Sequence, residues 1–262
     1  MNAPTPIDAA HAAMMAAPDD DTMRLRFYER IADGEMFLML SEEMAGETVR
    51  PDMFDLAEGR FVLAFDREER LTQFAGRAVP YAALAGRALA QMLAGQGVGL
   101  GLNLEVAPSS ILIPPAAVQW LAAATAQAPA KIEARLVEVA APAGLPETLI
   151  AALDTKLATA AGMARHAYLV AATYDSGARG HMLCFVDAAE GAQDALAQAT
   201  GEALAFSGIE AGALDVGFVT GGEPVAARLA RAGLRFDLPV PAGPAVPSPA
   251  PGGDPGKPPK LR

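Results

Sequence analysis

The residues best suited to metal or thiol chemistry are His181, Cys184 and Asp187, which follow one another at intervals of three, with His166 upstream. They belong to an apolar run that is typical of a strand. In a strand, neighbours three apart lie on opposite faces, so these side chains cannot converge on one ion. We therefore expect a buried thiol and a strand-end histidine. Ser176 lacks the GxSxG context of a hydrolase nucleophile, so no catalytic triad is predicted either.

A glycine-rich run, Gly95-Gln-Gly-Val-Gly-Leu-Gly101, resembles a phosphate-binding loop in composition. Its spacing is GxGxGxG, which is neither of the two common nucleotide-binding patterns. The residues that follow alternate like a strand and do not begin a helix, so a bound phosphate would lack converging N–H donors. We expect the end of a helix leading into a strand that closely approaches its neighbours.

Acidic residues gather between two expected strands and could resemble a carboxylate site. They are Glu42, Glu43, Glu47, Asp52, Asp55 and Glu58. A solvated loop is the commoner origin of such a cluster than a pair of catalytic acids. An acidic surface that faces a partner protein is the functional alternative.

The most informative stretch runs from Gly59 to Phe74 and joins an apolar strand to a charged turn. Phe61–Phe65 predicts a buried strand, and the turn Asp66–Arg70 follows it at the end where α/β domains often place their working surfaces. A second polar segment, Asn103–Glu105, follows the next glycine-rich strand. The sequence therefore predicts an interaction surface at these two turns, formed by Asp66, Glu68, Glu69, Arg70, Asn103 and Glu105.

Composition limits the classes of function. The net charge is −11 and the pI about 4.7, which disfavours binding to nucleic acids and to anionic membranes. A single cysteine and the absence of a basic leader or a long apolar run predict a soluble, cytoplasmic protein without disulfides. No cofactor is expected.

The elements needed to position these residues predict an α/β protein with mixed sheets, made of two consecutive domains and a disordered proline-rich tail. We expect a flexible arm over residues 1–18 and a first α/β domain over 19–126, with a helix from Pro80 to Leu93. Trp120 is expected to pack in the core of this domain. The best linker candidate is 127–131, Gln-Ala-Pro-Ala-Lys.

The second domain, 132–238, has the pattern β-α-β-β-α-β-α-β, with a hairpin around residues 174–180. Residues 239–262 contain nine prolines and four glycines, a composition that cannot build a core. A solvated tail is expected, with a docking peptide as the alternative, because PxxP spacings occur in it.

Three segments together resemble a known family. Arg60-Phe-Val-Leu-Ala-Phe-Asp66 with Glu69-Arg-Leu71, Gly99-Leu-Gly-Leu-Asn103 and Ser110-Ile-Leu-Ile-Pro114 are similar to the N-terminal domain of the bacterial SseB family, over about residues 23–126. Asp66 stands where the family often has Thr, and Leu104 where it often has Pro. The resemblance implies that the second domain corresponds to the family's C-terminal domain. It implies no enzyme activity and no catalytic residues.

The sequence thus favours a non-catalytic interaction or regulatory module with a protein partner. Two alternatives stay open. One is a sensor of a small molecule related to amino acids, which the serine-sensitivity phenotype behind the family name suggests. The other is an enzyme that works with backbone groups and carboxylates alone. The oligomeric state is not predicted.

Overall fold

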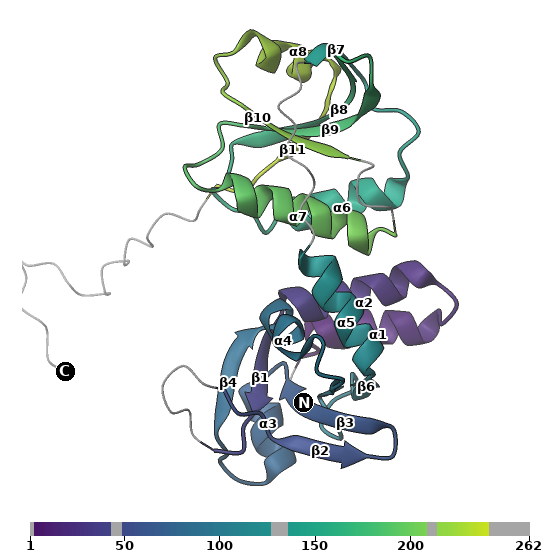
Figure 1. Ribbon diagram of the computed structural model, residues 1–262, viewed down its shortest axis with the longest axis vertical. Coiled ribbons are helices and arrows are strands. Elements are labelled where there is room, and N and C mark those ends of the chain that lie inside the picture. Colours follow the sequence, from purple (N-terminus) through teal and green to yellow (C-terminus); the bar gives the residue numbers. More distant parts are fainter. Residues whose placement is uncertain (1–2, 43–48, 127–135, 209–213, 241–262) are drawn as a thin grey trace, which may run out of the picture.

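The computed structural model describes residues 3–42, 49–126, 136–208 and 214–240. Within them the chain forms two α/β domains, the first up to residue 126 and the second from residue 136, as the sequence predicted for the fold class (Figure 1). The predicted linker 127–131 and nearly all of the predicted tail 239–262 lie outside the described residues.

The first domain contains a mixed sheet and five helices. Its elements are α1 Pro6–Ala16, α2 Asp21–Asp33, β1 Glu35–Met39, β2 Met53–Leu56, β3 Gly59–Phe65, α3 Glu68–Ala75, β4 Tyr81–Ala85, α4 Gly86–Leu93, β5 Gly99–Leu102, β6 Ile111–Ile113 and α5 Pro115–Ala126. The strand order is β4-β1-β3-β5-β6, with β2 also pairing with β3. Only β3 and β5 run parallel, so their carboxyl ends meet at one edge of the sheet.

Side chains alternate along β3 between two apolar clusters. Val62 and Ala64 face the core under α2, α4 and α5, whereas Leu63 and Phe65 face α3 on the other side of the sheet. This alternation explains why the apolar run at Phe61–Phe65 is continuous, because a strand buried on both faces needs apolar residues at every position.

The glycine-rich run is structural, as expected. Gly95 and Gly97 adopt positive φ angles of 75° and 67° after α4 has ended. A Cβ atom on Gly99 would lie 2.4 Å from the Phe61 ring, so this position requires glycine where β5 approaches β3.

The first eighteen residues differ from the flexible arm that the sequence suggested. Residues 6–16 form α1, which packs against α2. Thr5 and Asp8 make a capping box, and Pro6 stands in the first turn, which together specify a helix start. This local signature predicts a helix here, and α1 belongs to the first domain.

The helix expected from Pro80 to Leu93 is also corrected, because its first part is strand. Residues 81–85 pair with β1 along its whole length, and α4 begins only at Gly86. Tyr81-Ala-Ala-Leu-Ala85 has no strong preference of its own, so the free edge of β1 decided its conformation.

The second domain has the predicted order of elements. They are β7 Leu136–Ala140, α6 Glu147–Leu157, β8 His166–Tyr174, β9 Arg179–Val186, α7 Gln193–Phe206, β10 Asp215–Val219, α8 Pro224–Ala232 and β11 Leu234–Asp237. The sheet has the order β10-β9-β8-β11, with β9 and β10 parallel, and β7 pairs with the other half of β8. Helices α6 and α7 cover one face, and α8 covers the other.

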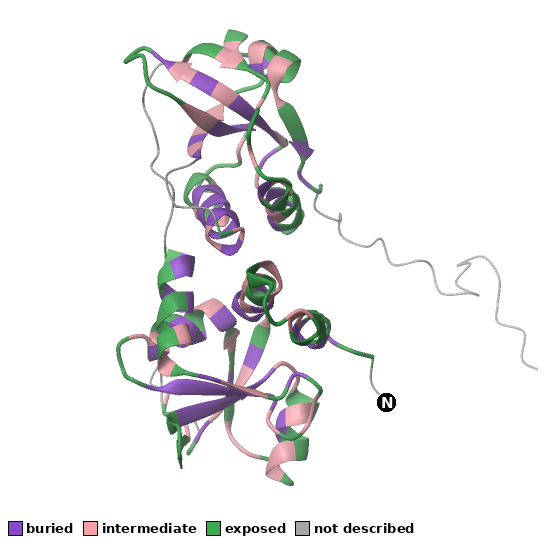
Figure 2. Cartoon of the chain, turned by 90° about the vertical axis from the view of Figure 1, so that its right-hand side faces the viewer, coloured by how far each residue is buried: buried purple, intermediate pink, exposed green. Residues whose placement is uncertain are grey.

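The two domains face each other through their helical layers. In Figure 1, α6 and α7 lie against the layer of α1, α2, α4 and α5, and the two sheets lie outside this helical centre. Figure 2 shows that buried residues gather in the strands and on the inward sides of these helices. Side chains that project between the layers are therefore removed from solvent by the second domain.

Candidate functional site

The two turns that the sequence selected meet at the carboxyl ends of β3 and β5. Arg70 donates to Asp66 at 2.7 Å, and the Asp66 amide donates to the side-chain oxygen of Asn103 at 3.0 Å. Asn103 is fully buried and adopts a left-handed φ of 50°, which asparagine tolerates better than most residues. The structure therefore brings Asp66, Arg70 and Asn103 together, but it buries them inside the first domain.

Asp8 of α1 completes this strand-end network, which we define as Thr5, Asp8, Asp66, Arg70, Asn103 and Ser109. Arg70 donates to both carboxylate oxygens of Asp8, and Ser109 donates to it at 2.6 Å. Burial by itself raises the pKa of Asp8, but the hydrogen bonds from Arg70, Ser109 and the Thr5 amide outweigh it and hold that pKa well below its usual range. The place where a ligand often binds is thus filled by the protein's own carboxylate.

The other three predicted residues, Glu68, Glu69 and Glu105, are exposed. Glu68 and Glu69 belong to α3, and Glu105 lies between Leu104 and Val106. We call the side of the first sheet that carries α3 the open sheet face. Its apolar side chains are only partly buried around Leu63, Phe65 and Leu71: Phe37, Met39, Phe54, Phe74, Val79, Leu104 and Val106. On this side the described residues contribute one helix of eight residues, α3, and these side chains stay partly exposed.

An interdomain quartet of alternating charges joins the domains. Asp33 and Arg87 come from the first domain, Lys156 and Glu202 from the second. Arg87 contacts Asp33 at 2.5 Å and Glu202 at 2.7 Å, and Lys156 contacts the same two carboxylates at 2.7 Å and 2.6 Å. Lys156 and Glu202 are almost completely buried. Each side chain contacts two side chains of opposite charge, and these attractions offset the large desolvation penalty of burying ions.

Aromatic side chains extend this interface. Trp120, expected in the core, is 37% exposed and makes an edge contact with Phe206 of the second domain, with ring centroids 5.9 Å apart. Gln198 of α7 also donates to the Thr125 carbonyl at 3.0 Å. Trp120 therefore serves the contact between domains.

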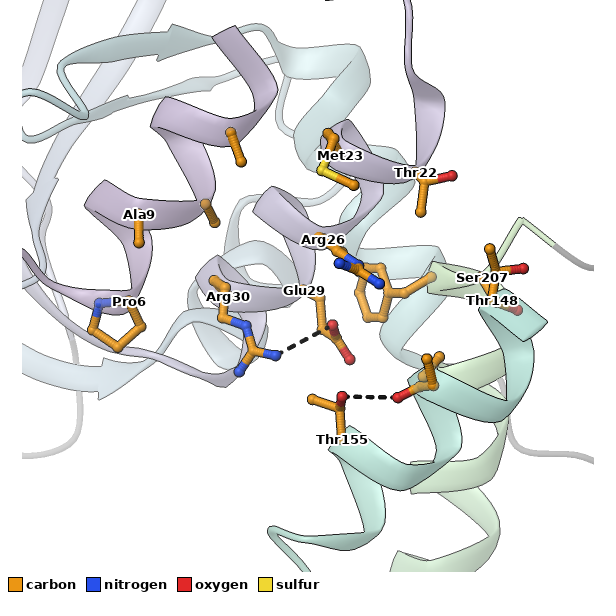
Figure 3. A pocket seen from close by; sticks show the side chains of 15 residues that line it. Pro6, Ala9, Thr22, Met23, Arg26, Glu29, Arg30, Thr148, Thr155 and Ser207 are labelled. Atoms are coloured by element: carbon orange, nitrogen blue, oxygen red, sulfur yellow. Dashed lines mark hydrogen bonds and ion pairs between the residues drawn. The ribbon is translucent and has the colours of Figure 1, made fainter. Parts of the chain in front are cut away.

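A pocket of about 370 Å³ lies between the domains beside the quartet. Helices α1 and α2 form one wall, and α6 with the end of α7 forms the other (Figure 3). Small side chains dominate the walls on α1 and α6: Ala9, Ala10, Ala13, Ala151, Ala152, Thr148 and Thr155. The charged side chains, Arg26, Glu29 and Arg30, all come from α2.

Glu29 is the unusual member of this pocket. Its residue is 4% exposed, and its Oε1 atom has no hydrogen-bond partner in the described structure. The other oxygen lies 3.7 Å from Arg30, too far for a hydrogen bond. Figure 3 shows its carboxylate pointing into the space between α2 and α6. Burial raises the pKa of Glu29, and the nearby Lys156 and Arg30 only partly oppose that rise.

The thiol of the second domain is buried, as the sequence predicted. Cys184 is buried under α8, and burial raises the pKa of its thiol to about 12, which makes it a poor nucleophile at neutral pH. In the part of the chain that the structure describes, no group of His, Cys, Asp or Glu side chains is arranged to hold a metal ion. None of the described helices combines the length and hydropathy needed to cross a bilayer.

Sequence reasoning missed Asp8, Glu29 and the quartet for different reasons. The capping box at Thr5 was a readable signal that placed Asp8 in a helix. The charges on α2 carried no comparable signal, because Glu29 and Asp33 lie on a polar helix that resembles an exposed one. The quartet contacts are also distant in the chain, because Lys156 lies 123 residues from Asp33 and Glu202 lies 115 residues from Arg87.

Comparison with known proteins identifies a family for the first domain. Residues 8–120 match the family described as SseB protein N-terminal domain. This range begins inside α1 and ends inside α5, so α1 is part of the matched domain. The match stops before the second domain, whose correspondence to the family's C-terminal domain stays a prediction. Searches of the curated proteins and of the solved structures gave no match.

Proposed function

We propose that this protein, which carries the SseB N-terminal domain, is a non-catalytic cytoplasmic interaction or regulatory module that binds a protein partner through the open sheet face. The observation that carries the proposal is the unequal covering of the first sheet. Four helices and the second domain cover one side, whereas a cluster of partly exposed aromatic and aliphatic residues is left around α3.

Exposed apolar area of this kind is typical of contact surfaces. Phe37 packs edge-on against the exposed Tyr81, and Phe74 packs against Phe65. Aromatic side chains supply much of the binding free energy at protein interfaces. The exposed carboxylates Glu68, Glu69 and Glu105 give this surface an acidic rim, so the matching partner carries an apolar patch with basic residues around it.

The buried strand-end network has a supporting role in this proposal. Arg70 and Asp66 hold the start of α3, and Asn103 holds the turn before Glu105. They fix the positions of the exposed carboxylates without contacting the partner. Of the six predicted surface residues, we therefore assign direct contact to Glu68, Glu69 and Glu105.

Affinity capture from native lysate tests the proposal. We expect the double variant Glu68→Lys/Glu69→Lys to lose most of a stoichiometric partner while its melting temperature stays within a few degrees. The control is Glu138→Lys/Glu190→Lys, which makes the same charge change at exposed positions of the second domain. Equal capture by both variants would rule out the open sheet face.

A second candidate function, a small-molecule sensor related to amino acids, is favoured by the interdomain pocket. Its volume of about 370 Å³ lies within the range of small-ligand sites. A ligand held between two domains would change how firmly they are joined, which gives a physical route from binding to regulation.

A further inference from the structure

We propose that the interdomain pocket binds a small zwitterion that carries both a primary ammonium group and a carboxylate, with Glu29 receiving the ammonium and Arg26 and Arg30 receiving the carboxylate. The inference rests on the second candidate function, the sensor, and specifies its site and ligand chemistry. It is independent of the open sheet face.

The first argument is the unmet bonding capacity of Glu29. A carboxylate has two oxygens that can accept about four hydrogen bonds. Here the side chain is nine-tenths or more buried and Oε1 accepts none in the described structure. Buried polar atoms are nearly always paired, so an exception inside a pocket points to a partner that binds there.

The second argument is the state of the two arginines. Arg26 is exposed and forms no ion pair with any described residue, and Arg30 has only the 3.7 Å contact with Glu29. Their guanidinium groups therefore retain donors in the geometry that binds a carboxylate bidentately.

The third argument is charge balance. Two arginines and one ionised glutamate give the pocket a net positive charge, which would repel a simple amine. A simple carboxylate would satisfy the arginines but leave Glu29 unpaired. A ligand with both groups pairs each charge and is itself neutral, so it satisfies all three side chains together.

The fourth argument is the shape of the walls. Alanine on α1 and alanine and threonine on α6 leave room beside the charged groups, and Phe206 adds an apolar surface to the lining. Because one wall belongs to each domain, a ligand would contact both.

The test measures the binding of small probes to the purified full-length protein by calorimetry and thermal shift. The probes are L-alanine and its two truncated forms, propionate without the ammonium and ethylamine without the carboxylate, followed by the other proteinogenic amino acids. We expect at least one amino acid to bind, and its truncated forms to bind at least tenfold more weakly.

Variants then locate the site. We expect Glu29→Gln to weaken the amino acid at least tenfold while leaving the affinity for its ammonium-free analogue within twofold. Arg26→Gln/Arg30→Gln should weaken both. Glu147→Gln, an exposed carboxylate at the start of α6, is the control and should change nothing.

The outcomes separate the two hypotheses. Binding that Glu29→Gln leaves unchanged would keep the sensor and overturn this site. A flat response to every amino acid by the folded wild-type protein would overturn both. Neither result bears on partner capture through Glu68 and Glu69, so the main proposed function is judged separately.

Discussion

Asp33 and Glu29 stand one helical turn apart on α2 and both face the second domain, yet they meet opposite surroundings. Asp33 is paired with Arg87 and Lys156 at hydrogen-bond distance. Glu29 is the more buried of the two, but its nearest cation lies 3.7 Å away and one oxygen has no partner. At the interface, the carboxylate on one turn of α2 is therefore paired, and the carboxylate on the turn before it is not.

The difference shows how burial and pairing can separate. Asp33 meets the ends of two long cationic side chains from α4 and α6, so the quartet closes on itself. At Glu29 the part of α6 that lines the pocket consists of alanine and threonine, while Lys156 of the same helix pairs with Asp33 and Glu202. Buried charge without a partner is destabilising, which is why we assign a ligand to Glu29 and none to Asp33.

The largest expected change in stability comes from breaking the interdomain quartet. Lys156→Met leaves Glu202, which is fully buried, with fewer cations around it, and should lower the free energy of unfolding by about 3–5 kcal/mol in urea. The double variant Lys156→Met/Glu202→Leu should recover most of that loss, because Asp33 and Arg87 still pair with each other. If the double variant is no more stable than the single one, the quartet is not held by the balance of charges.

A smaller loss is expected from Asp8, a buried carboxylate that is fully paired inside one domain. Asp8→Asn weakens the contact with Arg70 and should destabilise the protein by about 1.5–3 kcal/mol at pH 7. The pKa of Asp8 is depressed in the folded state, so its contribution is present above the unfolded value of about 4 and is lost as the pH falls below it.

Urea unfolding between pH 7 and pH 3 checks this pH dependence. The difference in the free energy of unfolding between wild type and Asp8→Asn should decrease steadily below about pH 4. Asp55→Asn, at an exposed side chain, serves as the control and should show no gap. A gap that stays constant with pH would mean that Asp8 acts through packing alone.

The smallest expected change in stability concerns Glu29 and should have the opposite sign. Glu29→Gln removes a buried charge and should stabilise the unliganded protein by about 1 kcal/mol at pH 7. Burial raises the pKa of Glu29, so folding favours the neutral form more than the unfolded chain does. The Glu29 carboxyl of the wild-type protein therefore contributes its full stabilisation below the unfolded pKa of about 4.3, and this stabilisation is lost as the pH rises.

Thermal and urea unfolding of the two proteins from pH 4 to pH 8 tests this sign. The extra free energy of unfolding of Glu29→Gln over wild type should increase with pH and nearly vanish near pH 4. The charged groups that act on the Glu29 carboxylate are Lys156, Arg30, Asp33 and Arg26. A variant less stable than wild type at pH 7 would show that Glu29 is satisfied by a partner and would remove the contrast with Asp33.

The sequence by itself determined much of this protein, and the physical reasons are local. Periodicity identified the order of elements in the second domain, because each helix and strand there has its own apolar pattern and a clear end. The apolar run at Phe61–Phe65 predicted the central strand, and the polar turns after it predicted where Asp66 and Asn103 would lie. The capping box at Thr5 was equally local and could have placed α1.

Only the tertiary structure decided which polar residues are free. Asp66, Arg70 and Asn103 bond to one another in the strand-end network, and α1 adds Asp8, which pairs with Arg70 from 62 residues away in the chain. Residues 81–85 became a strand because an unpaired edge was available. The quartet and the unpaired Glu29 depend on how two folded domains meet, a contact between side chains distant in the chain that leaves no local pattern in either segment.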